Sequence, residues 1–394
     1  MLIRKTFKYR LYPTKVQEET FLFILRRCRE LYNSALEERQ AAYRICGVSV
    51  GYAVQCHELL EIKEAFPAYQ KIGAHVLQDA LRRLDKAFQA FFRRVKNGEK
   101  PGYPRFKSKM RYHSFTFPDR ERWKLVDNRL KLLGIGDVKV KLHRPIEGTI
   151  KTCTIKRDVD QWYVFFSCQV EAPAPLPPSN KEVGLDLGVI HFATLSTGEH
   201  IANPRPYRKG LKRLKLLQQA KDCKKHRSHR RKRAAIRLAR AHRKVRNQRQ
   251  DFQHKLARRL VNEYGLIVME DLHIAQMVKA PEPKPDPEKE GAYLPNGAAA
   301  KGGLNQSILD AGWGQFQHFC VAKAEEAGRR IVFVDPYNTS QLCSGCGRLV
   351  PKDLEVRWHS CPYPDCGIEL DRDHNSARTI LFRGQEVAHR VTAL

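Results

Sequence analysis

At 394 residues the chain is long enough for two or three domains with their own hydrophobic cores, and a hydrophobic content of 42% excludes a disordered polypeptide. Its 72 Lys and Arg residues against 42 Asp and Glu residues give a formal net charge of +30, which favours a polyanionic partner, above all nucleic acid. No apolar run reaches the roughly eighteen residues of a membrane span, and the first residues lack the apolar segment of a signal peptide, so we expect a cytoplasmic protein with no membrane partner.

The beginning of the chain predicts one strand followed by helices. In KTFKYRLYP, apolar side chains alternate with basic and polar ones, which is typical of a strand (1–13). Thr14, with Gln17 three residues later, predicts a capping box and therefore the start of a helix. A second amphipathic helix is predicted over about 70–96. We expect a helical recognition domain over 14–100.

The next segment, 101–172, predicts a small β domain. It contains short runs of alternating polarity: HSFTFP, RLKLL, DVKVKL, TIKTCTIKRD and QWYVFFSCQV. The last two are separated only by the residues around Asp158–Gln161, which predicts a hairpin. We expect the strand at 1–13 to join this barrel-like domain in space. The Pro-rich stretch 173–180 then predicts a linker.

An α/β domain is predicted over 181–340. Its strand patterns are KEVGLDLGVIHFATLS, GLIVMEDL and RRIVFVD. Between the first two, residues 205–259 form a strongly basic helical segment. The alternative interpretation is a helix face exposed to solvent. Because the like charges of such a run repel one another, we favour contact with the phosphates of a nucleic acid. The Pro-, Gly- and Ala-rich residues 280–303 predict a mobile loop.

Four cysteines in CSGCGRLVPKDLEVRWHSCPYPDCG have the spacing of two zinc knuckles. Cys343 and Cys346 form a C-x2-C pair, and Cys361 and Cys366 form a C-x4-C pair after fourteen intervening residues. Four thiolates leave zinc no open coordination position, so we expect a structural Zn²⁺ in an insert over 341–368. Four unrelated free thiols are the alternative. The other seven cysteines have no pairing pattern, as in a reduced cytosolic protein.

Three acidic residues stand where carboxylates can hold metal. Asp186 shares its strand face with Gly184, and glycines there let a backbone or ligand come close. Glu270 ends the apolar run LIVM, and Asp373 begins a predicted helix. Three acids on separate elements of one domain can hold a pair of Mg²⁺ ions for phosphodiester hydrolysis. For Asp373 the alternative is an N-cap or surface role.

Several blocks, in order, resemble the TnpB (OrfB) family of transposon-encoded proteins, relatives of the type V CRISPR effectors. They are GLDLGVIHFATLS, VMEDL, VDPYNTSQLCSGCG, CPYPDCG and LDRDHNSARTIL, joined by KYRLYPTKVQEETF and PGYPRFKS nearer the N-terminus. The resemblance implies a multidomain α+β protein with a wedge-like β domain. It further implies an RNase H-like nuclease domain of the RuvC type (181–340 and 369–394), interrupted by the zinc-ribbon-like insert.

The resemblance implies that the catalytic acids are Asp186, Glu270 and Asp373, binding two Mg²⁺ ions. Other acids compete for these roles: Asp371 for the last position, with Asp271 and Asp335 as lesser candidates.

Four more residues belong to the same blocks. Asn375 is expected to orient the site and Arg372 to meet phosphate, whereas Thr339 and Ser340 match a family pair without a role that we can derive. The 280–303 loop is longer than the family's usual connection, which leaves substrate access open.

The function implied is that of an RNA-guided DNA endonuclease encoded by an insertion sequence. A structured guide RNA from the transposon end would bind the basic surfaces and pair with target DNA, which is cut beside a short motif. Two alternatives remain. One is a catalytically silent RNA-guided DNA-binding regulator, which intact carboxylates disfavour, and the other is a transposase performing DNA strand transfer, for which the same metal chemistry would serve.

Overall fold

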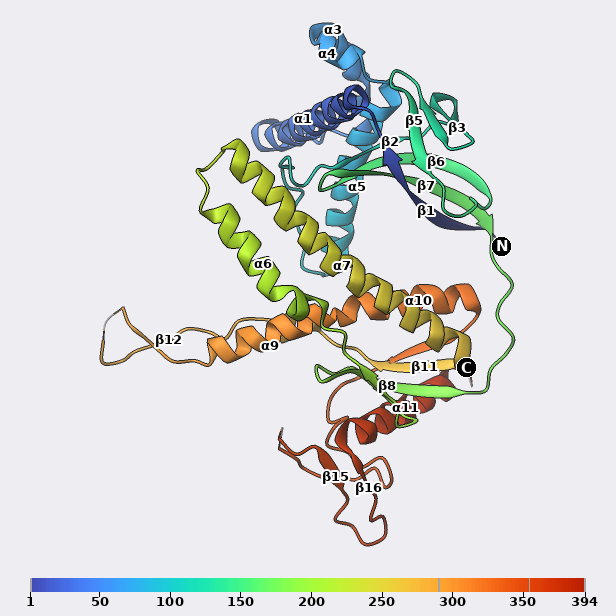
Figure 1. Ribbon diagram of the computed structural model, residues 1–394, viewed down its shortest axis with the longest axis vertical. Helices are drawn as coiled ribbons and strands as arrows, with labels where there is room; N and C mark the ends of the chain where they lie inside the picture. Colours follow the sequence, from blue (N-terminus) through green and yellow to red (C-terminus); the bar gives the residue numbers. More distant parts are fainter. Residues whose placement is uncertain (1, 290, 354, 393–394) are drawn as a thin grey trace. The chain divides into compact units, whose positions relative to one another are not determined.

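Two compact units make up the chain in this computed structural model, one of residues 1–172 and one of residues 173–394 (Figure 1). The structure describes residues 2–289, 291–353 and 355–392. Within these ranges, no helix combines the length and the apolar composition that crossing a bilayer requires. Each unit has a hydrophobic core of its own.

The first unit is built on a seven-stranded antiparallel sheet. Its strands follow the order β2-β6-β7-β1-β5-β4-β3 and lie at Leu2–Tyr12 (β1), Ser114–Phe117 (β2), Trp123–Val126 (β3), Arg129–Leu132 (β4), Gly136–Lys141 (β5), Thr149–Asp158 (β6) and Gln161–Glu171 (β7). Alternation along β1 buries Phe7, Tyr9 and Leu11 on one face. Since β1 pairs with β7 and β5, the prediction that the N-terminal strand joins the later β segment is confirmed. The β6–β7 hairpin is confirmed as well.

Two long helices pack with this sheet. They are α1 (Lys15–Cys46) and α5 (Ala74–Lys96), and the shorter elements are α2 (Tyr52–His57), α3 (Leu59–Ala65), α4 (Pro67–Gln70) and a 3-10 turn (Arg120–Arg122). The predicted capping box is present, because the Thr14 hydroxyl accepts the Gln17 N–H and the Gln17 side chain accepts the Thr14 N–H. On α1, Phe21 packs against Trp162 with ring centroids 4.9 Å apart. One buried cluster thus runs through both helices and the sheet, and a division at residue 100 stays a prediction.

The second unit holds a five-stranded mixed sheet. Its strands follow the order β10-β9-β8-β11-β14 and lie at Glu182–Asp186 (β8), His191–Leu195 (β9), His200–Ala202 (β10), Leu266–Glu270 (β11) and Arg330–Val334 (β14). The strands β8, β9 and β10 pair in antiparallel fashion, whereas β11 runs parallel to both β8 and β14. A parallel pair needs a long crossover, and the basic helical segment lies in the one between β8 and β11.

Helices cover both faces of this sheet (Figure 1). The helices of this unit lie at Pro206–Asp222 (α6), His229–Glu263 (α7), Ile274–Met277 (α8), Ala298–Ala311 (α9), Trp313–Ala327 (α10) and Arg372–Thr392 (α11), and α6 packs against α7 instead of against the sheet. On one face, α7 and α10 share a core with Leu185 and Met269. On the other face, α11 packs Ile380 and Ala388 against Val268. The period of two therefore sends alternate side chains of β8 and β11 to opposite helix layers.

Helix α11 lies directly on the backbone of β8. A Cβ atom added at Gly184 would lie 2.2 Å from the Ala377 carbonyl oxygen and 2.7 Å from the Leu381 nitrogen. Similarly, a Cβ added at Gly384 would lie 2.3 Å from Cγ2 of Val268. The prediction that Gly184 allows a backbone to come close is confirmed, and that backbone is the one of α11.

The predicted loop over 280–303 is shorter than expected. Residues Ala298–Gly303 belong to α9, because three consecutive alanines and a lysine are good helix formers that outweigh the two glycines after them. Before α9, the strands β12 (Lys284–Pro285) and β13 (Tyr293–Leu294) form a small antiparallel pair.

The cysteine-bearing segment contains one further pair of strands. Here β15 (Trp358–Ser360) lies antiparallel to β16 (Glu369–Asp371), which leads into α11. The pairing therefore reaches past residue 368, where the insert was predicted to end, because β16 supplies the hydrogen-bonding partner for β15.

Candidate acid site and cysteine module

Asp186 is the last residue of β8 and lies on the strand face that α11 covers. It shares this face with Gly184, which contacts the helix backbone. The side chain of Ser376, a buried residue in the N-terminal part of α11, favours the charged form of the Asp186 carboxyl group and so lowers its pKa. Asp186 is thereby directed toward the beginning of α11, where the helix dipole stabilises negative charge.

Glu270 ends β11 on the same side of the sheet. It alternates with Val268, which packs against α11, and its side chain is only 8% exposed. The Thr339 hydroxyl donates a hydrogen bond of 2.5 Å to Oε1 of Glu270. Gln317 on α10 donates to the Glu270 backbone carbonyl at 2.8 Å. Both the strand end and the carboxylate are thus held by hydrogen bonds from other segments.

Asp373 lies in the first turn of α11, and Asp371 caps that helix. The Asp371 Oδ1 atom accepts the backbone N–H groups of Asp373, at 2.9 Å, and His374, at 3.1 Å. The N-cap alternative is therefore wrong for Asp373, because the residue two positions earlier fills that role.

The charges of Glu270 and Asp373 act on Asp186. Burial raises the pKa of Asp186 well above its usual range, and the carboxylates of Glu270 and Asp373 raise that pKa further. The nearby Arg372 charge and the Ser376 hydrogen bond oppose these effects. For Glu270, burial likewise raises the pKa, while the Thr339 hydrogen bond and the Arg383 charge lower it. The structure thus places two other carboxyl groups close enough to Asp186 to oppose its ionisation.

The lesser candidates lie elsewhere or have other partners. Asp271 and Asp335 are exposed, whereas Glu270 is buried. Asn375 is fully buried and hydrogen-bonds to the backbone of Leu342 and Ser344 beside the first cysteine pair. The expectation that it orients the site stays a prediction, and its amide is hydrogen-bonded to this segment.

Arg372 does not present its guanidinium to solvent. The side chain is 8% exposed, and Nη1 donates to the carbonyls of Asp353, at 2.9 Å, and Val356, at 3.3 Å. The expectation that it meets phosphate is wrong in this structure, because burial and the carbonyl partners hold it inside the cysteine-bearing segment.

Two residues of the acid site escaped the sequence analysis. Thr339 matched a family pair without a derivable role, and no chemical signal marked its hydroxyl as a partner of Glu270. Ser376 lies three residues after Asp373 on a predicted helix, so the two share a helix face, and this spacing could have revealed it.

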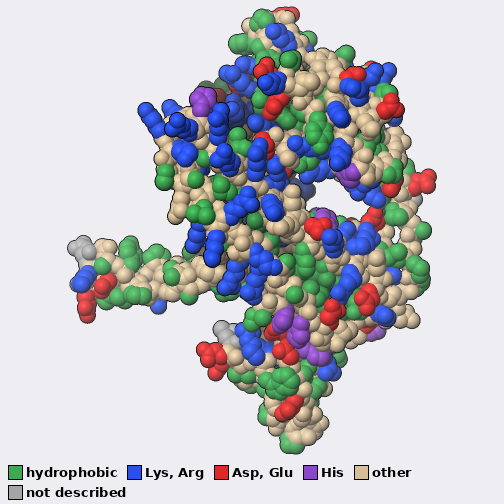
Figure 2. Space-filling view, in the orientation of Figure 1, with side chains coloured by type: hydrophobic (Ala, Val, Ile, Leu, Met, Phe, Trp, Pro, Cys, Tyr) green, Lys and Arg blue, Asp and Glu red, His purple; other side chains and the backbone are tan. Residues whose placement is uncertain are grey.

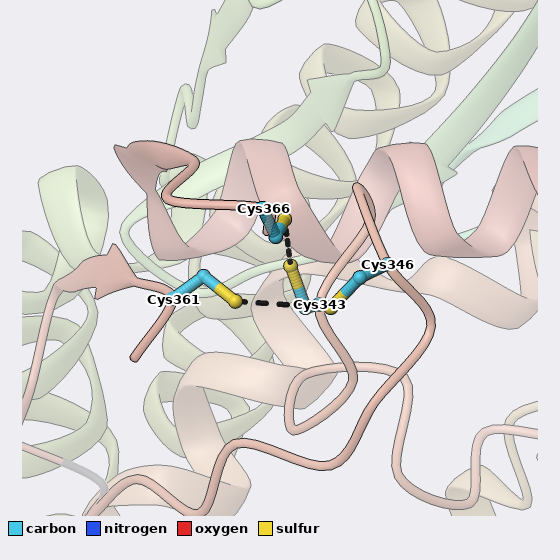
Figure 3. A group of neighbouring side chains, drawn as sticks. All are labelled: Cys343, Cys346, Cys361 and Cys366. Carbon is cyan, nitrogen blue, oxygen red and sulfur yellow. Dashed lines mark hydrogen bonds between the residues drawn. The ribbon is translucent and has the colours of Figure 1, made fainter. Parts of the chain in front are cut away.

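The four cysteines converge at one point (Figure 3). Their sulfur atoms all lie within 4.8 Å of one another, with Cys343 3.6 Å from Cys366 and Cys346 3.7 Å from Cys361. Zinc bonded to four sulfurs at about 2.3 Å would space them about 3.8 Å apart. The alternative of four unrelated thiols is wrong, and the cluster could hold a metal ion. Residues 341–371, which carry these ligands and the β15–β16 pair, are called the cysteine module below.

Close packing around the sulfurs explains one glycine of the first pair. A Cβ at Gly345 would lie 2.8 Å from the Cys366 sulfur, and the Gly345 N–H donates to the Cys343 sulfur at 3.4 Å. The backbone therefore approaches the ligands as knuckle geometry requires.

The helices α6 and α7 form a basic surface (Figure 2). Between them lies a groove of about 730 Å³ with an apolar floor that includes Leu214 and Val245. Among the residues that the structure describes, no carboxylate side chain lines this groove. Its basic rim consists of Lys209, Arg213, Arg237, Arg240 and Lys244. A surface of this charge suits the phosphates of a nucleic acid.

Three family models match the chain. One described as "Probable transposase" matches residues 165–280, one described as "Cas12f1-like, TNB domain" matches 313–380, and one described as "Helix-turn-helix domain" matches 1–45. In this structure, the last range forms β1 and nearly all of α1. The second range spans α10, the cysteine module and the beginning of α11.

A protein of Streptomyces pristinaespiralis is 32% identical over 97% of this chain and 90% of its own length. The chain belongs to the TnpB (OrfB) family. Another relative, InsQ of Escherichia coli K12, is 28% identical over 97% of this chain and 93% of its own length. Both carry the name "Putative RNA-guided DNA endonuclease".

The fold is similar to a solved member of a related group. The structure of a Cas12f1 in complex with single-guide RNA and target DNA superposes with a TM-score of 0.54 at 15% identity, covering 96% of this chain and 98% of that one. The predicted mixed α+β architecture of several parts is thereby confirmed at the level of the fold.

Proposed function

We propose that this protein is an RNA-guided DNA endonuclease whose nuclease site is formed by Asp186, Glu270 and Asp373. The observation that carries the proposal is the convergence of three carboxyl groups, from β8, β11 and α11, on one face of the sheet, where they raise the pKa of Asp186. Buried like charges are costly unless a cation offsets them, so a purely structural role would leave this cost unexplained.

The spread of the acids favours two ions over one. Oxygen ligands of a single Mg²⁺ lie at most about 4.2 Å apart, since each bond is about 2.1 Å. Among the described residues, only the cysteines form a group of three or more potential ligands whose atoms all lie within 4.8 Å. A pair of ions about 4 Å apart spans a wider set of carboxylates. When bound, such ions would activate water and stabilise the leaving oxygen of a phosphodiester.

The residues around the acids prepare this site. Ser376 favours the charged form of Asp186, and Thr339 holds the Glu270 carboxylate by a hydrogen bond. Asp371 caps α11 and so fixes the first turn that carries Asp373. The four cysteines, with their sulfur spacing, fit a structural Zn²⁺ that stabilises the module without taking part in chemistry.

The basic helices support a nucleic-acid partner. The groove between α6 and α7 is ringed by Lys and Arg and would contact phosphates without reading sequence. Sequence selectivity would then come from a guide RNA pairing with target DNA, as the names of the relatives suggest, with a short flanking motif read by the protein.

The test begins with the protein expressed together with its native downstream DNA. Nucleic acid that copurifies with it is sequenced, and the complex is then given a plasmid matching the variable end of that RNA, with Mg²⁺. We expect a discrete RNA and cleavage of the plasmid. Asp186→Ala is expected to bind the same RNA without cleaving, and Asp271→Asn, which removes an exposed neighbouring carboxylate, is the matched control.

Each other outcome has a clear meaning. Cleavage by Asp186→Ala would refute the assignment of the acid site. Target binding without any cleavage by the wild-type protein would instead favour an RNA-guided regulator. If no discrete RNA copurified, the guided mechanism would be wrong and a DNA strand transferase would have to be tested.

A further inference from the structure

The chain is hydrogen-bonded to the acid-bearing elements at two points near the start of the cysteine module, one at Thr339 just before the module and one at Leu342 and Ser344 around Cys343. Thr339, four residues before Cys343, donates to Glu270 at 2.5 Å, and both side chains are less than 9% exposed. Asn375, two residues after Asp373, is fully buried. Each link joins the segment at the start of the module to an element that carries one of the three acids.

The Thr339 hydroxyl is directed to the carboxylate in preference to another acceptor. It has one proton, and the other acceptor in reach is the Pro336 carbonyl at 3.1 Å, which is 0.6 Å farther than the Glu270 oxygen. Hydrogen bonds to a charged acceptor are shorter and stronger than neutral ones. Because Thr339 is 3% exposed, its hydroxyl has little access to water as a replacement partner.

The Asn375 amide, on α11, forms two hydrogen bonds with the backbone around Cys343. Its Nδ2 donates to the Leu342 carbonyl at 2.7 Å, and its Oδ1 accepts the Ser344 N–H at 2.8 Å. These two backbone groups flank the first metal-ligand candidate on either side. A displacement of the first cysteine pair would therefore be transmitted to the turn that carries Asp373.

We propose that Thr339 and Asn375 are positioning residues through which the folded cysteine module sets the geometry of the acid site. This inference rests on the proposed function, because it assumes that the acids bind divalent cations. The module then acts on cation affinity at the acids as well as on any nucleic acid it contacts. Partners of metal ligands commonly change metal affinity or activity by about tenfold to a hundredfold when removed.

The test uses full-length, zinc-loaded protein and Mn²⁺ as the probe. Binding is followed by the loss of the free Mn²⁺ signal in electron paramagnetic resonance, and the signal that Asp186→Ala abolishes defines the acid site. Thr339→Val keeps the shape of the side chain but removes the hydroxyl, and we expect about tenfold or weaker Mn²⁺ binding. Thr339→Ser restores the hydroxyl and is expected to bind like the wild type.

The control removes a buried hydroxyl from the first unit. Thr116 is 9% exposed, and its hydroxyl forms a hydrogen bond of 2.9 Å with that of Thr154. Thr116→Val should leave Mn²⁺ binding unchanged. A parallel variant, Cys346→Ser, disrupts the module and is expected to weaken the same Mn²⁺ site, which a module acting only on nucleic acid would not do.

In cleavage assays, Thr339→Val should need about tenfold more Mg²⁺ while RNA and target binding stay as in the wild type. Wild-type Mn²⁺ affinity in Thr339→Val would overturn the inference. So would equal losses in Thr339→Val and Thr339→Ser, since they would indicate packing and not the hydroxyl. If Mn²⁺ binding follows the expected pattern but the wild type cleaves nothing, the coupling stands and the proposed function is wrong.

Discussion

The close packing of α11 on β8 predicts that the single substitution Gly184→Ala strongly lowers both stability and DNA cleavage. The new Cβ would lie 2.2 Å from the Ala377 carbonyl oxygen, whereas ordinary contacts begin at about 3.4 Å. The helix would have to retreat by roughly 1 Å, because the opposing atoms belong to its backbone and cannot rotate away. Overpacking of this kind costs about 1–3 kcal/mol, and the rigid contact favours the upper value.

Both stability and cleavage should report this shift. For a unit of this size, about 3 kcal/mol lowers the melting temperature by roughly 6–12 °C. A displacement of roughly 1 Å between Asp186 on β8 and Asp373 on α11 should lower the rate constant for DNA cleavage by about a hundredfold. The measurements are differential scanning calorimetry and single-turnover cleavage at saturating Mg²⁺.

A second glycine provides the control. Gly302 lies inside α9, and a Cβ there would meet nothing within 4 Å. Gly302→Ala should leave cleavage unchanged and raise stability by about 0.5–1 kcal/mol, since alanine favours the helix. Wild-type melting and cleavage in Gly184→Ala would refute the close packing of α11 on β8 and the account of Asp186 built on it.

Three further predictions concern the carboxylates and the cysteines. Asp371→Asn should cleave near the wild-type rate, because asparagine caps helices as well as aspartate does. Asp373→Asn should lose cleavage. Equal losses of the two variants in single-turnover assays would contradict the roles assigned to Asp371 and Asp373. Because burial and the neighbouring acids raise the pKa of folded Asp186, the folded state binds more protons and loses stability as pH rises above the unfolded carboxyl pKa of about 4. In Mg²⁺-free buffer at pH 7.5, the melting temperature of Asp186→Asn should therefore be about 2–4 °C above that of the wild type, which corresponds to roughly 1 kcal/mol. The difference in melting temperature should be smaller at pH 5. A difference that does not change with pH would count against the raised pKa of Asp186. Cys346→Ser should lower bound zinc from one ion per chain to none by elemental analysis and weaken target binding, and full zinc content would show that the cluster is not the site.

Local patterns in the sequence were sufficient for much of the secondary structure. The Thr14 capping box, the alternation in β1 and the β6–β7 hairpin involve neighbours in the chain, and the structure contains all three. The spacing of the four cysteines likewise limits them to one site, since short knuckles and a fourteen-residue connection can bring them together.

At the start of α11, local sequence patterns do not determine which aspartate caps the helix. Asp371 and Asp373 are both suitable caps by residue type, and only the path of the backbone decides which carboxylate faces the exposed N–H groups. The same applies to the loop at 280–303, where alanines and glycines compete and the helix begins at Ala298.

The composition of the acid site follows from the sequence, but its assembly follows from the tertiary structure. Periodicity alone places Asp186 and Glu270 at strand ends with a definite face. It does not say that β11 pairs beside β8, that α11 covers that face, or that Thr339 reaches Glu270 across a sequence separation of 69 residues. These relations depend on long-range packing, in which contacts between distant segments become favourable only when the whole sheet and its helices are formed.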